Sequence, residues 1–218
     1  MSLDDLTRMR DRRTADRAAL DQLLDEQLVG TLATVTTDGR PWAVPMLYAR
    51  VGDRLLIHGS TGAGALRQVA AGSEGVLSVH VFDGLVIATS MFEHSANYRS
   101  AVVRGPLLRL TGDEAVAALD AISDGLLPGR RAEVRPMLTK EVRATVALAL
   151  DLTDDNWILK VNDDDADEEL HEDGVWTGVV PVRTAYGEPQ RSPWLGEEYD
   201  VPPSVAALVA GQRRGTNR

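Results

Sequence analysis

Short apolar runs separated by glycine-containing turns fill the first half of the chain and constrain its fold more than any other feature. Residues 29–37 are rich in β-branched side chains, and a second apolar run follows at residues 41–50. The pair Asp38-Gly39 stands between them, and an Asp-Gly pair in this position is a strong signal for a β-hairpin. The first two strands are therefore predicted to form a hairpin.

Four more runs of the same kind bring the number of predicted strands to six by residue 110. They lie at residues 54–58, 76–82, 85–92 and 100–110. Asp83-Gly84 is predicted to turn the chain between two of them, and Gly105-Pro106 to interrupt the last. Six short strands with turns between them predict a mainly β (α+β) fold built on a closed or nearly closed antiparallel barrel.

Helices are predicted around this sheet. Leucines at helical spacing predict an amphipathic helix over about residues 14–28, and a short helix is expected at 65–71. Thr111 and Glu114 have the spacing of a capping box at the start of a further helix. Later strands are predicted at residues 146–152, with one buried face, and 175–182.

The chain of 218 residues is predicted to form one domain over residues 1–210. Residues 184–210 are rich in Gly, Pro and charge and are expected to be an irregular extension, and residues 211–218 a disordered tail.

Charge and cysteine content exclude several function classes. The net charge of −10 disfavours nucleic acid and anionic membranes as partners, because phosphate binding needs clustered Lys and Arg. The absence of cysteine excludes thiol catalysis, disulfides and Cys-ligated metal centres, so redox chemistry needs a bound cofactor. No signal peptide or membrane span is apparent, and we expect a cytoplasmic protein.

A dense polar segment at residues 94–105 carries His, Ser, Asn, Tyr and Arg side chains and runs into a predicted strand. Its first part is predicted to be a ligand-binding loop, because function concentrates on loops held by a rigid scaffold. The acidic run at residues 163–173 lacks the Gly of a calcium loop and is expected to be a solvated surface, so no metal site is predicted. No serine has a recognisable triad, and no catalytic residue is predicted.

Several of these segments, taken in order, give the chain a family resemblance. Gly30-Thr31-Leu32-Ala33-Thr34, Val44-Pro45-Met46, Leu56-Ile57-His58-Gly59-Ser60 and His94-Ser95-Ala96-Asn97-Tyr98-Arg99-Ser100 resemble the pyridoxamine 5'-phosphate oxidase-like family of flavin-binding split barrels. The resemblance covers about residues 20–183 and is closest to the flavin-nucleotide-binding branch that includes nitroimidazole-reductase-like proteins.

The resemblance implies a six-stranded antiparallel split β-barrel with peripheral helices. It also implies a homodimer that holds two FMN molecules in clefts between the protomers. In such a cleft one chain would supply a strand along the flavin ring and a loop at the phosphate, with Arg67 as the fixed charge, and the second chain would supply side chains that face the ring. The residues implied to bind the cofactor are Val44, Pro45, Met46, His58, Gly59, Ser60, Thr61, Arg67, Asn97, Arg99, Ser100 and Trp176.

The chain departs from the family pattern in three places. The loop before Leu66 lacks the basic residues that relatives usually carry, and the C-terminal Arg-x-His motif of the true oxidases is missing. Lys160-Val161-Asn162 also lacks the Arg of the Lys-x-Arg pattern and leads into an acidic turn. The resemblance therefore favours an FMN-dependent oxidoreductase that acts on an unidentified small molecule, and not a true pyridoxamine 5'-phosphate oxidase. The alternatives are a non-catalytic protein that binds or stores flavin, haem or deazaflavin, and a cofactor-free dimer.

Overall fold

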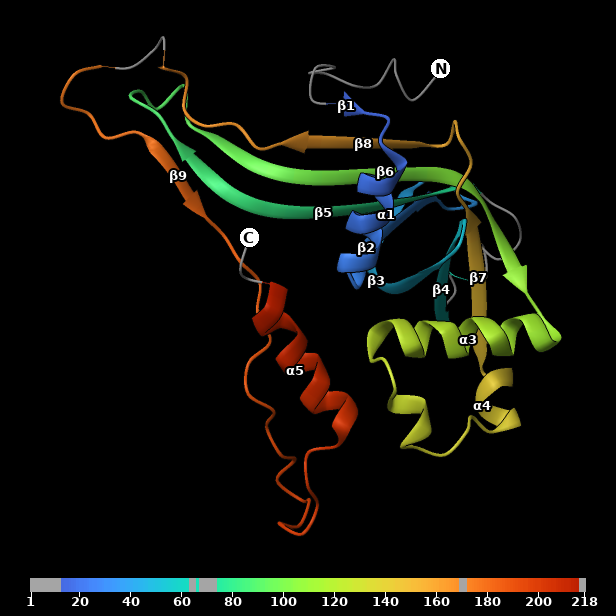
Figure 1. The fold of residues 1–218 in the computed structure, drawn as a ribbon. Helices are drawn as coiled ribbons and strands as arrows, with labels where there is room; N and C mark the ends of the chain where they lie inside the picture. The colour runs from blue at the N-terminus through green and yellow to red at the C-terminus, as the bar shows by residue number, and fades with distance from the viewer. Residues whose placement is uncertain (1–12, 63–65, 67–73, 169–171, 216–218) are drawn as a thin grey trace.

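The fold is known from a computed structural model, which describes residues 13–62, 66, 74–168 and 172–215 (Figure 1). The short helix expected at residues 65–71 lies outside the described residues except for Leu66, which is helical and buried. The strands are β1 (Arg13–Thr14), β2 (Val29–Val35), β3 (Pro41–Val51), β4 (Arg54–Ser60), β5 (Glu74–Ile87), β6 (Ser95–Leu110), β7 (Thr145–Asp151), β8 (Trp157–Asn162) and β9 (Gly178–Pro181). The helices are α1 (Arg17–Glu26), α3 (Gly112–Leu126), η3 (Arg130–Ala132), α4 (Thr139–Arg143) and α5 (Pro203–Gly215).

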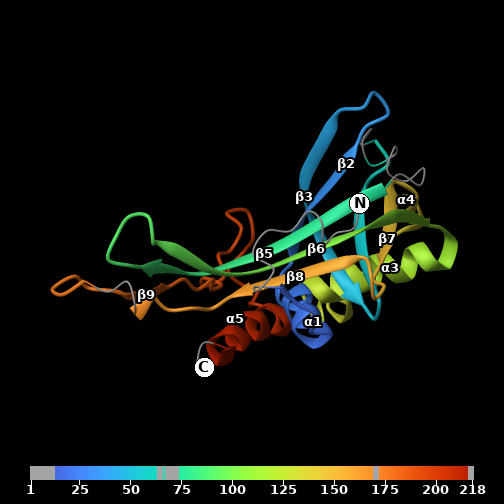
Figure 2. The same cartoon turned by 90° about the horizontal axis from the view of Figure 1, so that it is seen from above.

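Six of the strands close into a ring, which confirms the predicted antiparallel barrel. The ring runs β6-β7-β4-β3-β2-β5 and returns from β5 to β6. Every pairing in it is antiparallel. β8 and β1 extend the sheet beyond β6, and β9 pairs with the distal half of β5. The distal parts of β5 and β6 therefore leave the barrel with β9 as an arm, seen at the left of Figures 1 and 2.

The first hairpin forms where the sequence predicted it. β2 pairs with β3 from Val29 opposite Leu47 to Val35 opposite Pro41. Gly39 in the connecting turn has a φ of 80°, a conformation that glycine adopts without steric cost. The local turn signal was sufficient here, because only two adjacent strands take part.

The second hairpin differs from the prediction. Residues 76–92 do not form two strands with a turn at Asp83-Gly84; instead β5 continues to Ile87, and the chain turns at residues 88–94. Asp83 is the extra residue of a β-bulge, at which the register shifts between Phe82 and Gly84. The expected loop after His94 is strand from Ser95 on, and β6 is not interrupted at Gly105-Pro106. Twelve paired positions between β5 and β6 override these local turn signals.

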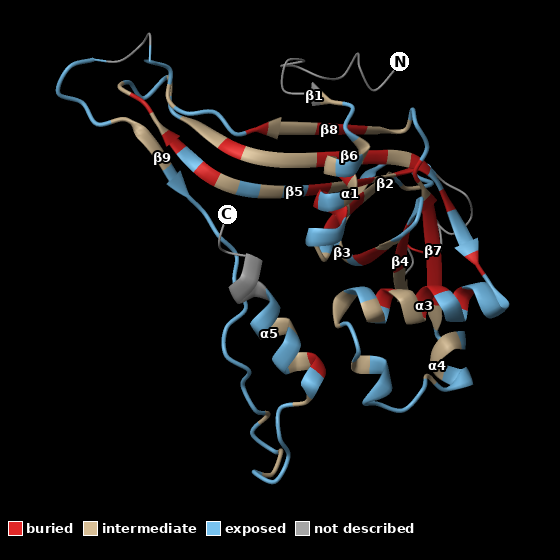
Figure 3. Ribbon diagram, in the orientation of Figure 1, coloured by how far each residue is buried: buried red, intermediate tan, exposed pale blue. Residues whose placement is uncertain are grey.

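β7 is buried on both faces, although one buried face was predicted. Leu148 and Leu150 point into the barrel core, whereas Ala147 and Ala149 pack in a second apolar cluster with α3. Figure 3 shows β7 as a continuous buried strand beside α3. Small residues on the outer face let α3 lie close to the sheet.

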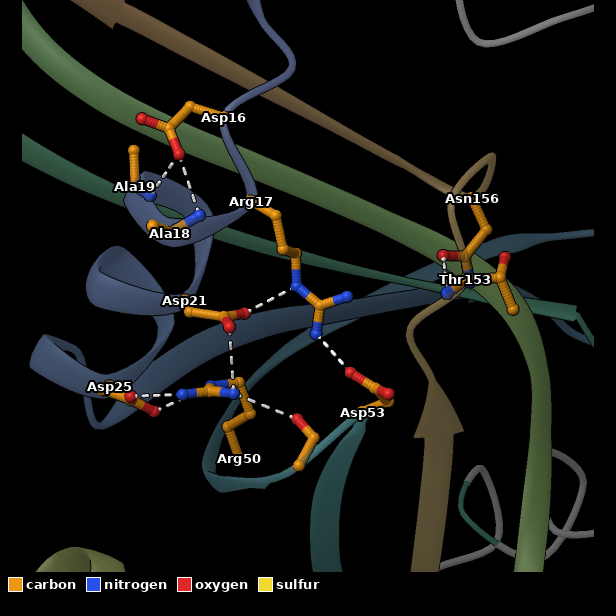
Figure 4. Close-up of polar contacts among 11 residues, drawn as sticks. Asp16, Arg17, Ala18, Ala19, Asp21, Asp25, Arg50, Asp53, Thr153 and Asn156 are labelled. Atoms are coloured by element: carbon orange, nitrogen blue, oxygen red, sulfur yellow. Dashed lines mark hydrogen bonds and ion pairs between the residues drawn. The ribbon is translucent and has the colours of Figure 1, made fainter.

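Helix α1 packs against the barrel core and is shorter than predicted. Asp16 is its N-cap, and its carboxylate accepts the backbone N–H groups of Ala18 and Ala19 at 2.9 and 3.2 Å. Leu20, Leu23 and Leu24 are buried in the core. Arg17 bonds Asp21, while Arg50 of β3 bonds Asp21 and Asp25, so an ionic cluster fixes the helix to the barrel (Figure 4).

Three further elements depart from the sequence-based prediction. Thr111 is the N-cap of α3, but its side chain makes no capping hydrogen bond, so the predicted capping box is absent. β8 was not predicted. Helix α5 occupies Pro203–Gly215, where an irregular extension and the start of a disordered tail were expected. None of the described helices has the length and apolar character needed to cross a membrane.

Candidate cofactor site

The barrel opens where β3 and β4 separate. The two strands pair only from Tyr48 opposite Ile57 to Val51 opposite Arg54. Beyond that point β3 continues along β2, whereas β4 continues along β7. Within the described chain, residues 41–47 of β3 and 58–60 of β4 thus face each other without strand pairing, and their backbone groups on these edges are available to a ligand.

Side chains at this opening alternate between the core and the outside. Met46 packs against the barrel core, and Pro45 and Leu47 point outward and are exposed. Gly59 stands across the opening. A Cβ atom there would collide with Leu66 and lie 3.8 Å from Met46 Cε. The two predicted segments around Pro45 and Gly59 are therefore brought together, and a side chain at position 59 would displace Leu66.

His58 lies on the outward face of the β4 edge. Its ring is half-buried, and Nδ1 is buried without a hydrogen-bond partner. Burial lowers the pKa of the imidazole below its ordinary value of 6.5, because the charged form loses hydration. The ring is thus neutral near pH 7, and its buried Nδ1 has capacity for one further hydrogen bond.

The lowered pKa of His58 predicts how the stability of the protein depends on pH. In the folded protein His58 takes up its proton at a lower pH than in the unfolded chain, so the unfolded chain binds more protons below about pH 6.5. Stability is then lost as pH falls through this range. We expect urea unfolding of His58→Gln to show a weaker loss between pH 7 and 5 than the unmodified protein. His80→Gln, at an exposed position, serves as control. Equal pH dependence in all three proteins would contradict the assignment.

The loop after β4 is fastened to helix α4. Thr61 donates both its N–H and its hydroxyl to the carbonyl oxygen of Ala144, at 3.0 and 3.2 Å. Ser60 Oγ accepts the Gly62 N–H at 3.1 Å and retains its own hydrogen to donate. Arg67, the predicted fixed charge, lies outside the described residues.

The second group of predicted residues lies on the arm and is engaged within the chain. Asn97 donates to the carbonyl of Asp164 at 2.9 Å and accepts from Asn162 Nδ2 at 3.0 Å. Arg99 bonds both carboxylate oxygens of Asp83 at 3.1 Å and Glu26 at 2.6 Å. These carboxylates raise the pKa of Arg99 further, so its charge is permanent and already paired.

The remaining predicted residues do not join the barrel opening in one chain. Ser100 of β6 lies opposite His80 of β5 and is half-buried. Trp176 precedes β9 and is 66% exposed, and its ring lies 3.1 Å from where a Cβ of Gly178 would stand. β9 pairs with the distal part of β5, away from β4. One chain therefore presents two separate groups of predicted residues.

The sequence analysis did not identify the residues around the β-bulge at Asp83. The extra residue Asp83 turns its carboxylate to Arg99, and it places Phe82 and Leu85 opposite Tyr98 and Ala96 on the same face of the arm. Phe82 and Leu85 are 43% and 46% exposed. The sequence signal for this bulge is the spacing of two large apolar side chains three residues apart on one strand. In a regular strand, residues three apart lie on opposite faces of the sheet.

Known proteins resemble this chain in sequence and in fold. Residues 16–156 match the family described as pyridoxamine 5'-phosphate oxidase. The solved structure of an FAD and heme binding protein from Mycobacterium smegmatis has 43% sequence identity and a TM-score of 0.87, over 91% of this chain and 97% of that protein. The flavocytochrome Anf3 from Azotobacter vinelandii has 26% identity and a TM-score of 0.84, over 93% and 94%. Comparison with curated protein sequences finds no match.

Proposed function

Because the chain belongs to the pyridoxamine 5'-phosphate oxidase family, we propose that it binds a flavin nucleotide at the opening between β3 and β4. The observation that carries this proposal is the pair of unpaired strand edges, at residues 41–47 and 58–60. Backbone donors and acceptors at such edges suit the pyrimidine edge of a flavin, and apolar side chains beside them suit its ring.

The residues at the opening fit this cofactor in chemical terms. Gly59 leaves room for close approach, the Ser60 hydroxyl donates no hydrogen bond to another described residue, and the neutral ring of His58 has a buried nitrogen without a partner there. When bound, a flavin supplies reversible electron transfer. The chain's own task is then to bind and orient it, and to exclude water from one face of the ring.

The proposal extends the predicted FMN to FAD. The relative with 43% identity across nearly the whole chain is described as an FAD and heme binding protein, which favours FAD. The flavin released by denaturation separates by chromatography as FMN or FAD, and either result identifies the nucleotide.

We also propose an oxidoreductase that works as a homodimer. Phe82, Leu85 and Val180 form an exposed apolar face on the arm, each between 43% and 47% exposed. A second copy that covers this face would bury these apolar side chains. The activity is tested by anaerobic reduction of the bound flavin with NADH or NADPH and reoxidation by an acceptor. A flavin that stays oxidised with every donor would favour a binding or storage role.

Haem is a second candidate ligand, and one residue favours it. His58 offers a neutral imidazole at physiological pH, the form that ligates iron. The absorbance spectrum separates the candidates, since oxidised flavin has its own visible bands and a Soret band indicates haem. Protein that stays colourless after addition of FMN, FAD and haemin would overturn both.

A charge placed on the outer face of β3 tests the location of the flavin. We expect Pro45→Glu to weaken flavin binding by about tenfold, equivalent to about 1.4 kcal/mol, because a carboxylate would occupy the exposed face beside the opening and repel the electron-rich ring edge. Leu108→Glu adds the same charge at an exposed position on β6 and should leave affinity unchanged. Equal weakening in both variants would place the flavin elsewhere.

A further inference from the structure

A cavity of about 460 Å³ is lined by residues of α3, η3 and α4 and by the residues between η3 and α4. This volume is within the range of small-molecule sites, about 300–1,000 Å³. Its apolar wall is formed by Val116, Val134, Pro136, Met137 and Val142.

Three guanidinium groups share the cavity with this apolar wall. Arg130, Arg131 and Arg135 line it together with a single carboxylate, that of Asp120. Asp124, Glu133 and Glu141 also pair with these arginines, so the whole cluster holds four carboxylates for three guanidinium groups. The chemical signal of this cavity is therefore the presence of guanidinium donors beside apolar surface, and not an excess of charge.

Carboxylates at and behind the wall hold these arginines in place. Arg131 bonds Asp120 and Asp124 at 2.7 and 2.8 Å, and Arg130 bonds Glu133 at 3.0 Å. Arg131 thereby ties the η3 turn to α3. Fixed guanidinium groups lose little conformational entropy when a ligand binds.

Arg135 and Glu141 form the third pair, at 2.6 and 2.9 Å. The guanidinium and the backbone N–H of Leu138 lower the pKa of Glu141 to about 2, so this partner stays ionised across the working range of pH.

Donors remain on the guanidinium groups after these contacts. In the described structure Arg130 uses only Nη1 and Arg135 only its two Nη atoms, while Arg131 leaves Nε without a partner. Each group can thus add a charge-assisted hydrogen bond to an anionic oxygen without first releasing its carboxylate.

We propose that this cavity is a binding site for a small amphipathic anion, a molecule with an apolar body and a carboxylate, phosphate or sulfonate end. The body packs on Val134, Met137 and Val142, and the anionic end accepts from Arg130 and Arg135. The site is separate from the β3–β4 opening and does not depend on the flavin proposal.

Paired fluorescent probes test the site on the full-length protein. 8-Anilinonaphthalene-1-sulfonate has an apolar body with a sulfonate, and N-phenyl-1-naphthylamine has the same body without the charge. We expect the double variant Arg130→Gln, Arg135→Gln to weaken binding of the anionic probe about tenfold and to leave the neutral probe unaffected. Arg109→Gln, at an exposed position on β6, should change neither.

A second variant guards against a folding defect in the first and against probe bound elsewhere. Val134→Trp places a large ring at the cavity wall and should reduce the number of bound probe molecules for both probes. Val51→Ser, at an exposed position at the end of β3, should not alter this number for the anionic probe. Unchanged affinity for the anionic probe in the arginine variant, with unchanged stoichiometry in Val134→Trp, would overturn the proposal.

Discussion

Replacing Leu148 by alanine is expected to lower the free energy of unfolding by about 3–4 kcal/mol. Leu148 is 1% exposed, and it lies in the barrel core on β7, opposite Ile57 on one side and Arg109 on the other. Removing a buried leucine side chain loses its transfer free energy and leaves a cavity, at a cost of about 2–5 kcal/mol in total. A closed ring of strands cannot collapse easily onto that space, which places the expected value in the upper half of the range.

Leu108→Ala on the neighbouring strand is the matched control. Leu108 is 40% exposed and pairs with Ala149, so its truncation removes the same atoms without a buried cavity. We expect a loss below about 1 kcal/mol. Chemical denaturation of both variants, with unchanged m-values, measures the two losses. Equal losses would mean that the interior face of β7 is not the one assigned here.

The parts of the fold that were predicted correctly depend on local signals. The hairpin of β2 and β3 follows from one Asp-Gly turn between two apolar runs, and helix α1 follows from its leucine spacing and the cap at Asp16. In both cases the residues that determine the element are near one another in the chain. Sequence patterns are strongest in that situation.

The parts that differ depend on partners far away in sequence. Asp83-Gly84 has the local character of a turn, but its neighbours on β6 keep β5 extended and absorb Asp83 as a bulge. Likewise Ser204 of α5 is held by Glu133, 71 residues earlier, through its N–H at 2.9 Å and its hydroxyl at 2.6 Å. Neither contact is visible in a local window.

For the candidate site, too, local sequence identifies the residues but not their contacts. The family resemblance implies that the segments around Pro45 and Gly59 bind one cofactor, and the two segments lie near each other where β3 and β4 separate. The same resemblance assigned Arg99 to a flavin, but its charge is taken up by Asp83 and Glu26 of the same chain. Sequence supplied the type of each side chain, whereas its partner follows only from the bulge and from the docking of α1.

Arg50→Ala is expected to cost about 2–3 kcal/mol of unfolding free energy, because Arg50 is the cation on which two carboxylates of α1 converge (Figure 4). Its side chain is 17% exposed, and it bonds Asp25 at 2.9 Å, Asp21 at 3.3 Å and the carbonyl of Gly52 at 3.0 Å. Hydrogen bonds to charged groups are worth about 1.5–3 kcal/mol, and a loss larger than about 3 kcal/mol is not expected because Asp25 is half exposed and screened by solvent.

Two further variants separate geometry from charge. Arg50→Lys keeps the charge but lacks the planar fork that bonds Asp25 through two nitrogens, so we expect an intermediate loss. Arg54→Ala removes an exposed pair with Asp151 and should cost less than about 1 kcal/mol. If Arg50→Ala and Arg54→Ala are equally mild in urea unfolding, the ionic cluster does not fix α1, and its buried leucines alone hold the helix on the barrel.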